Sequence, residues 1–244
     1  MGTHGDPMAF HEMGPADGRP VILIHGLFSN AQVNWIKYGH AAKLAAQGRR
    51  VIMPDLRAHG ESARSHDPAD YPTDILADDN LGLVAQLGFG PGAYDLGGYS
   101  LGARTTTRML TRGAKPGKAM LAGMGLEGLL DLANRAAFFR RVLEGAGTHE
   151  KFSSEWMAEA FLKTTGGDPK ALLLLMNCFP AVPRAALSAF DIPVMVLTGA
   201  QDNDNGSARA LAEAIPGAVY GEVPGNHMSA VTQPELGDAI ARWF

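Results

Sequence analysis

The sequence has little cysteine, few charged residues and no long apolar run. Of its 244 residues only Cys178 is a cysteine, which excludes an intrachain disulfide and a cysteine-based metal cluster. Lysine plus arginine number 21 and aspartate plus glutamate 25, giving a formal charge of −4. This mild acidic excess provides no basic surface for a nucleic acid or an anionic membrane. We therefore expect neither as a partner.

Hydrophobic stretches are short throughout the chain. No stretch approaches the roughly 18 uninterrupted apolar residues of a membrane span. Residues 1–13 are too polar and too interrupted for a signal peptide. With 46% hydrophobic residues, however, the chain can bury a sizeable core. These features predict a compact cytoplasmic protein, and they leave its oligomeric state open.

Short apolar segments alternate with helix-like segments along most of the chain. Continuous apolar runs of this length are typical of strands that are covered on both faces, as in a parallel sheet. Strands are expected at Val21–Ile24, Val51–Met53, Ala93–Leu96, Ala119–Ala122, Val194–Leu197 and Ala218–Val223. Helices are expected at Val33–Gln47, Thr73–Leu87, Leu101–Arg112, Ser207–Ile215 and Pro234–Phe244. This alternation predicts an α/β fold with a mostly parallel, doubly wound sheet.

One interval, residues 126–188, breaks the alternation because it contains no convincing strand. It holds a helix-like series rich in aromatic and aliphatic side chains. We interpret it as a helical lid inserted late in the chain, between core segments 1–125 and 189–244. The alternative is that these helices only pack on one flank of the sheet.

Gly98-Tyr99-Ser100-Leu101-Gly102 has the pattern G-x-S-x-G between a predicted strand and a predicted helix. A sharp turn in this context strains the central residue and exposes its hydroxyl above the edge of the sheet. The first backbone N–H groups of the helix are aimed at the same place. Ser100 is therefore the candidate nucleophile, and the N–H of Leu101 is a candidate oxyanion donor.

A second donor is expected from the loop His25-Gly26-Leu27-Phe28, which directly follows the first predicted strand. Such a loop can present a backbone N–H toward Ser100. Leu27 is the preferred donor and Phe28 the second choice, whereas His25 is interpreted as structural. The side chains of Phe28 and Tyr99 are the expected substrate contacts.

Candidate acid and base residues follow two later strands. Leu197-Thr198-Gly199-Ala200-Gln201-Asp202 ends in an acid, and Gly225-Asn226-His227 ends in a histidine. Side chains at the carboxyl ends of parallel strands point into the crevice where open α/β sheets bind ligands. Asp204 is a second acid close by. We interpret it as a solvated loop residue or a cap for the helix near Ser207.

With these motifs in this order, the chain resembles the α/β-hydrolase superfamily over nearly its whole length, in its serine-esterase branch with a helical lid. The resemblance favours Asp202, in a G-x-x-D turn, as the acid. Asp55–Ser62 is similar to the superfamily's D-x-R-x-H-G-x-S segment, which is structural there, so His59 is not expected to act as a second base. Epoxide hydrolases and haloalkane dehalogenases carry aspartate where this chain has Ser100, which argues against both activities.

These residue types predict a serine hydrolase that forms an acyl-enzyme and needs no metal or organic cofactor. His227 would take the proton of Ser100, and Asp202 would orient the histidine ring. An apolar lid with few charged residues facing the site predicts small, uncharged, largely apolar carboxylic esters. A C–C bond hydrolase, a lactonase or a cofactor-free perhydrolase would use the same triad. A non-catalytic ligand-binding protein is the alternative outside enzymes.

Overall fold

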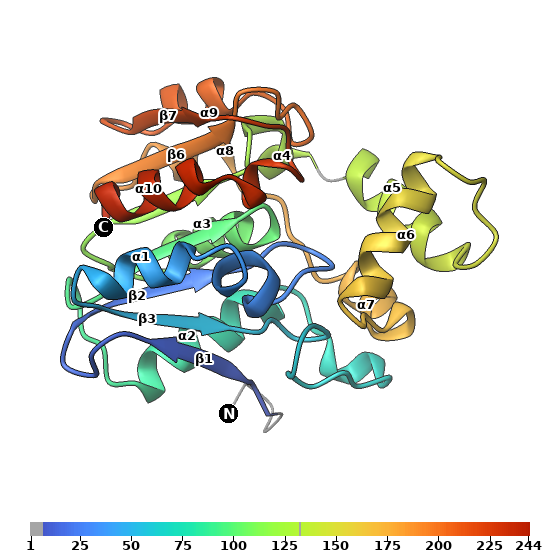
Figure 1. The fold of residues 1–244 in the computed structure, drawn as a ribbon, viewed down its shortest axis with the longest axis horizontal. Helices are drawn as coiled ribbons and strands as arrows, with labels where there is room; N and C mark the ends of the chain where they lie inside the picture. Colours follow the sequence, from blue (N-terminus) through green and yellow to red (C-terminus); the bar gives the residue numbers. More distant parts are fainter. Residues whose placement is uncertain (1–6, 132) are drawn as a thin grey trace.

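The computed structural model describes residues 7–131 and 133–244, and in this part of the chain seven strands form one sheet (Figure 1). The strand order is β1-β3-β2-β4-β5-β6-β7. Within these residues every neighbouring pair is parallel except β1 and β3, which are antiparallel. The strands are β1 (Phe10–Met13), β2 (Arg19–Ile24), β3 (Arg49–Pro54), β4 (Asp95–Tyr99), β5 (Ala119–Ala122), β6 (Val194–Gly199) and β7 (Val219–Val223). Two parts of the chain on which predictions were made lie outside the described residues. They are residues 1–6, part of the segment judged too polar for a signal peptide, and Leu132 of the predicted lid.

The six predicted strands are β2 to β7, and the sheet has the predicted, mostly parallel α/β architecture. β1 is the strand that the sequence does not reveal. It lies at the edge of the sheet, and its side chains alternate between exposed and half-buried. Because only one face of β1 packs on the protein, its sequence needs no apolar run.

The strong apolar runs arise because the central strands are covered on both faces. In β2, Val21 and Leu23 belong to one buried cluster, while Ile22 and Ile24 belong to another. Successive strand residues point to opposite faces of a sheet, so the two clusters lie on opposite sides of it. All four side chains are fully buried.

The core helices are α1 (His40–Ala46), α2 (Ile75–Gln86), α3 (Leu101–Thr111), α9 (Ala208–Ala214) and α10 (Pro234–Trp243). One prediction is wrong, because Val33–Gln47 is not a single helix. Gln32–Ile36 forms a π-helical turn, and Gly39 then adopts φ 77°, a left-handed conformation that no α-helix interior contains. α1 starts only after this glycine.

The interval 126–188 contains α4 (Leu126–Leu130), α5 (Ala133–Glu144), α6 (Ser154–Thr164), α7 (Pro169–Leu175) and α8 (Arg184–Leu187). α5, α6 and α7 stand apart from the sheet, beyond the carboxyl ends of its strands (Figure 1). In contrast, Leu129 of α4 and Leu187 of α8 share a buried cluster with Val194 and Val196 of β6. The interval thus contains two helices that pack against β6 and three that stand apart from the sheet. We use "lid" below for α5, α6 and α7. No helix among the described residues has the length and apolar character needed to cross a bilayer.

Candidate active site

Ser100 occupies a strained turn between β4 and α3. Its φ of 55° and ψ of −112° lie in a region that residues other than glycine rarely adopt. A Cβ at Gly98 would lie 2.2 Å from the backbone of Gly102, and a Cβ at Gly102 would lie 2.0 Å from the carbonyl oxygen of Ile24. Glycine at both positions therefore allows α3 to start against β2 and β4. This close packing fixes the position of the Ser100 hydroxyl.

The structure brings Ser100, Asp202 and His227 together from three separate strand ends. Nε2 of His227 lies 3.0 Å from Oγ of Ser100, and Nδ1 of His227 lies 2.8 Å from Oδ2 of Asp202. Because a carboxylate only accepts hydrogen bonds, Nδ1 carries the proton, and Nε2 is free to accept from the serine hydroxyl. The side chains of His227 and Asp202 are 10% and 3% exposed. The three groups have the arrangement that proton transfer from Ser100 requires.

Asp204 does not compete for the histidine. Its side chain is 48% exposed and lies 3.4 Å from the guanidinium of Arg135 on α5. Its backbone N–H donates to Oδ1 of Asp202 at 3.1 Å, which helps to orient that carboxylate. The cap of α9 comes from the hydroxyl of Ser207, which accepts from Ala210 N–H at 3.0 Å, so the predicted capping role of Asp204 is wrong.

The loop after β2 passes directly beside Ser100. A Cβ at Gly26 would lie 3.4 Å from the Cβ of Ser100. The N–H of Phe28, the second choice of oxyanion donor, already donates to Nε2 of His59 at 3.1 Å. Among the hydrogen bonds of the described residues, none is donated by the backbone N–H of Leu27 or Leu101. These two N–H groups therefore remain the candidates for binding an oxyanion.

Two buried histidines join this loop to the loop after β3. Nε2 of His25 accepts from the N–H of Leu56 at 2.9 Å, and Nε2 of His59 accepts from the N–H of Phe28. The other ring nitrogen of each histidine donates to a backbone carbonyl. Burial lowers the pKa of both rings, that of His59 to about 3. Both rings therefore stay neutral at ordinary pH, and their hydrogen bonds cross-link the two loops.

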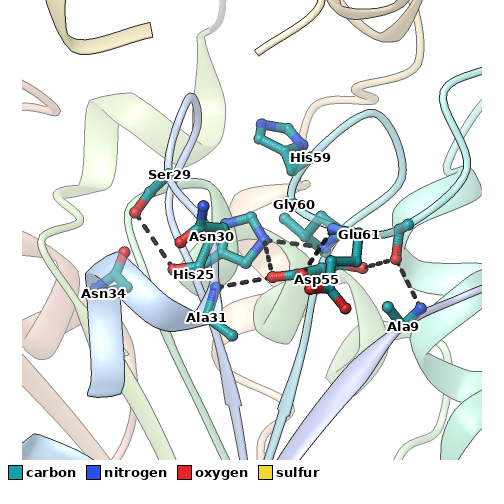
Figure 2. Close-up of polar contacts among 12 residues, drawn as sticks. Ala9, His25, Ser29, Asn30, Ala31, Asn34, Asp55, His59, Gly60 and Glu61 are labelled. Carbon is teal, nitrogen blue, oxygen red and sulfur yellow. Dashed lines mark hydrogen bonds and ion pairs between the residues drawn. The ribbon is translucent and has the colours of Figure 1, made fainter. Parts of the chain in front are cut away.

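Asp55 reinforces the same connection (Figure 2). Its Oδ1 accepts from the N–H of Ala31 at 2.8 Å, and its Oδ2 accepts from the N–H of Glu61 at 2.9 Å. A Cβ at Gly60, whose φ is 51°, would lie 2.1 Å from Oδ2 of Asp55. Arg57 of the same segment forms a buried, bidentate ion pair with Asp79. The contacts of Asp55 thus hold the loop after β3 against the loop after β2, which passes beside Ser100.

The two predicted substrate contacts have other partners. The Tyr99 hydroxyl donates to the carbonyl of His227 at 2.6 Å, so it fixes the turn that carries the histidine. The Phe28 ring packs edge-on against Phe139 of the lid with centroids 5.3 Å apart, and the Phe28 carbonyl accepts from the hydroxyl of Thr165 at 2.7 Å. Phe28 is not among the residues that line the two cavities described below, and a contact of its side chain with substrate stays a prediction.

Two cavities open on either side of Ser100 and Leu27, which line both. The larger has a volume of about 210 Å³. Its other lining residues include Val33, Tyr38, Tyr99, Phe161, His227, Met228 and Val231. The smaller has a volume of about 50 Å³ and is lined by residues that include Leu101, Arg104, Met124, Arg135, Phe139, Met176 and Phe179. The expectation of few charged residues concerned the lid, and Arg135 is the charged lid residue among those that line the smaller cavity; Arg104 reaches it from α3. Arg104 is not among the site residues expected from the sequence, although it lies four residues, about one helical turn, after Ser100.

Comparisons with known proteins agree with the fold. A model of the Alpha/beta hydrolase family matches residues 21–237. The chain is 34% identical over 145 residues to the dihydrolipoyllysine-residue acetyltransferase component of the acetoin cleaving system of Pseudomonas putida. The match includes 54% of this chain but 37% of that relative, so the chain spans little more than a third of its length.

Solved structures resemble the chain over nearly its whole length. A thermophilic esterase from Thermogutta terrifontis has a TM-score of 0.78 and 25% identity, with 98% of this chain and 93% of the esterase covered. The enol-lactonase from Burkholderia xenovorans LB400 has a TM-score of 0.74 and 20% identity, with 98% and 95% covered. Fold and family model agree, and the chain belongs to the alpha/beta hydrolase family.

Proposed function

We propose that the protein is a serine hydrolase that cleaves small carboxylic esters through an acyl-enzyme. The observation that carries the proposal is the contact of one histidine with both a nucleophile and an acid. Nε2 of His227 lies 3.0 Å from Ser100 Oγ, while its Nδ1 lies 2.8 Å from Asp202. A serine hydroxyl is a weak nucleophile by itself and needs such a base.

In the first half-reaction, Oγ of Ser100 attacks the ester carbonyl carbon as Nε2 of His227 takes the hydroxyl proton. The carbonyl oxygen becomes an oxyanion that accepts from the N–H groups of Leu27 and Leu101. Asp202 stabilises the imidazolium through Nδ1. His227 then gives its proton to the leaving alcohol, and the acyl group remains on Ser100. In the second half-reaction water attacks the acyl carbon while His227 takes its proton, and return of that proton to Ser100 releases the carboxylic acid.

The larger cavity supports a small, largely apolar substrate portion. Its volume of about 210 Å³ is below the ~300–1,000 Å³ of pockets for drug-sized ligands. Apolar and aromatic side chains such as Val33, Phe161 and Val231 contribute much of its lining. An acyl or alcohol group of a few carbon atoms fits such a space.

A substrate panel on the purified chain tests the proposal. It contains p-nitrophenyl acetate and butyrate, a simple lactone, and a vinylogous diketone for C–C hydrolysis, followed by a fluorophosphonate probe. We expect turnover of the p-nitrophenyl esters and one probe molecule bound per chain, at Ser100. Probe labelling without turnover of any ester would overturn the proposal and favour a C–C hydrolase or a ligand-binding protein.

A further inference from the structure

Two arginines line the smaller cavity. Arg104 lies one turn after Ser100 on α3, and its backbone N–H donates to the Ser100 carbonyl at 3.0 Å. Arg135 reaches the same cavity from the lid. No aspartate or glutamate is among the described residues that line it. Two arginine side chains therefore contribute to the mainly apolar lining of a space that opens beside the candidate nucleophile.

Arg104 is buried without a negatively charged partner. Its side chain donates to the carbonyls of Pro180 and Gly128, and the residue is 4% exposed. No carboxylate of the described residues lies within ion-pair distance of it. Burial and the neighbouring Arg108 lower the pKa of Arg104 to about 10, so its charge persists near neutral pH. Backbone carbonyls satisfy its N–H groups but do not neutralise a buried charge, which is unfavourable without a counter-ion.

Arg135 is held only loosely. Its side chain is 28% exposed, and its guanidinium stacks over the Phe139 ring, 5.0 Å from the centroid. Its 3.4 Å contact with the exposed carboxylate of Asp204 is a surface ion pair, which contributes little free energy. The other acid near Ser100, Asp202, is engaged by His227. The lining of the cavity therefore offers a ligand anion two cations and no carboxylate, and Asp204 contacts Arg135 from outside that lining.

We propose that the smaller cavity is a carboxylate subsite, so that the preferred substrates are esters carrying a carboxylate a few carbon atoms from the scissile carbonyl. Guanidinium groups suit carboxylates because two N–H donors match two oxygens. The volume of about 50 Å³ accommodates a few non-hydrogen atoms, since ~10–15 Å³ of such space accepts one water molecule. The apolar remainder of the ester occupies the larger cavity. This inference rests on the proposed function and replaces the expectation of uncharged substrates.

Two matched pairs of esters test the subsite with the full chain. Monoethyl succinate and ethyl 4-methylpentanoate differ in a carboxylate against an isopropyl group on the acyl side. The 3-acetoxypropanoate anion and 3-methylbutyl acetate differ in the same way on the alcohol side. Proton release at constant pH gives kcat/KM for each. In at least one pair we expect the charged ester to exceed its apolar counterpart by about tenfold, the size of one charge-assisted hydrogen bond.

Two variants on α5 test whether Arg135 causes the preference for the charged ester. Arg135→Gln should lower that charged-to-apolar ratio about tenfold. Arg140→Gln is the matched control, because Arg140 lies on α5 but contacts Asn177 and lines neither cavity, and it should keep the ratio. A preference for the apolar ester in both pairs, or a ratio that Arg135→Gln leaves unchanged, would overturn the subsite. Turnover of the apolar esters would then still support the proposed function, whereas no turnover of all four would overturn both.

Discussion

Three histidines of the loops around the candidate site, His25, His59 and His227, are all buried but have different partners. His25 and His59 are fully enclosed, and both ring nitrogens of each bond to backbone groups. The His227 side chain is 10% exposed and lies between a hydroxyl and a carboxylate. His25 and His59 stay neutral because burial disfavours the charged ring, and their bonds to backbone groups hold two loops together. His227 instead lies between an acid and a nucleophile, where it is placed to accept the proton of Ser100. Burial and partners, rather than the residue type, distinguish the two supporting histidines, His25 and His59, from the candidate catalytic one.

The largest expected effect follows removal of the nucleophile. Ser100→Ala should lower ester turnover by about 10⁴-fold or more, because the hydroxyl forms the covalent intermediate. The variant should still fold, since Gly98 and Gly102 provide the close packing of the turn. Steady-state rates with p-nitrophenyl butyrate measure the loss, and thermal unfolding checks the fold. A folded variant that kept a tenth of the activity would contradict the covalent mechanism.

The next effect distinguishes the two acids. Asp202→Asn should reduce kcat by roughly 10⁴-fold, because the amide favours the wrong histidine tautomer. Asp204→Asn is the matched control two residues away, and its half-exposed carboxylate contacts Arg135 instead. It should retain most of the activity. If Asp204→Asn were the more damaging change, the acid would have been assigned to the wrong residue.

The histidines that hold the two loops together, His25 and His59, should affect the free energy of unfolding rather than the rate of ester turnover. Because the pKa of His59 is lowered to about 3 in the folded chain, the unfolded chain binds the proton first as pH falls. The free energy of unfolding should thus be fully retained above about pH 6.5 and decrease below it, by up to about 1.4 kcal/mol per pH unit for this group. His25 acts in the same direction.

Urea unfolding between pH 7 and pH 4.5 measures that slope. His59→Gln should have a shallower slope than the unmodified chain, because one proton-binding group is removed. Equal slopes for the unmodified chain and His59→Gln would show that His59 is not held neutral by the fold.

The smallest effect is expected at Tyr99. Tyr99→Phe removes the hydrogen bond to the His227 carbonyl, at a cost of about 1 kcal/mol in unfolding free energy. The histidine turn should then be less well fixed, and kcat should fall a few-fold with KM little changed. Kinetics together with urea unfolding test this. A rise in KM without loss of stability would instead support the original prediction that Tyr99 contacts substrate.

The fold was largely predictable because burial leaves a pattern in the sequence. Val21–Ile24 is apolar throughout because both faces of β2 are covered, whereas Phe10–Met13 is an edge strand with no such run. The break before α1 depends on one glycine, Gly39, in a left-handed conformation. A periodic apolar pattern does not reveal it.

The positions of Ser100, Asp202 and His227 were predictable because each lies in a short local motif. Other features of the site depend on contacts between distant segments. Phe28 meets Phe139 of the lid, and Arg135 reaches the cavity from α5. No local sequence pattern marks such a contact, so the charged character of the smaller cavity emerged only from the structure.

In the proposed mechanism Ser100 carries the acyl group during turnover. The chain is mixed with excess p-nitrophenyl acetate, quenched with acid within the first turnovers, digested and analysed by mass spectrometry. We expect one acetyl group on the peptide that contains Ser100, and none after Ser100→Ala. Release of p-nitrophenol by the enzyme with no acetyl group on that peptide, or with acetylation at another residue that tracks turnover, would contradict it.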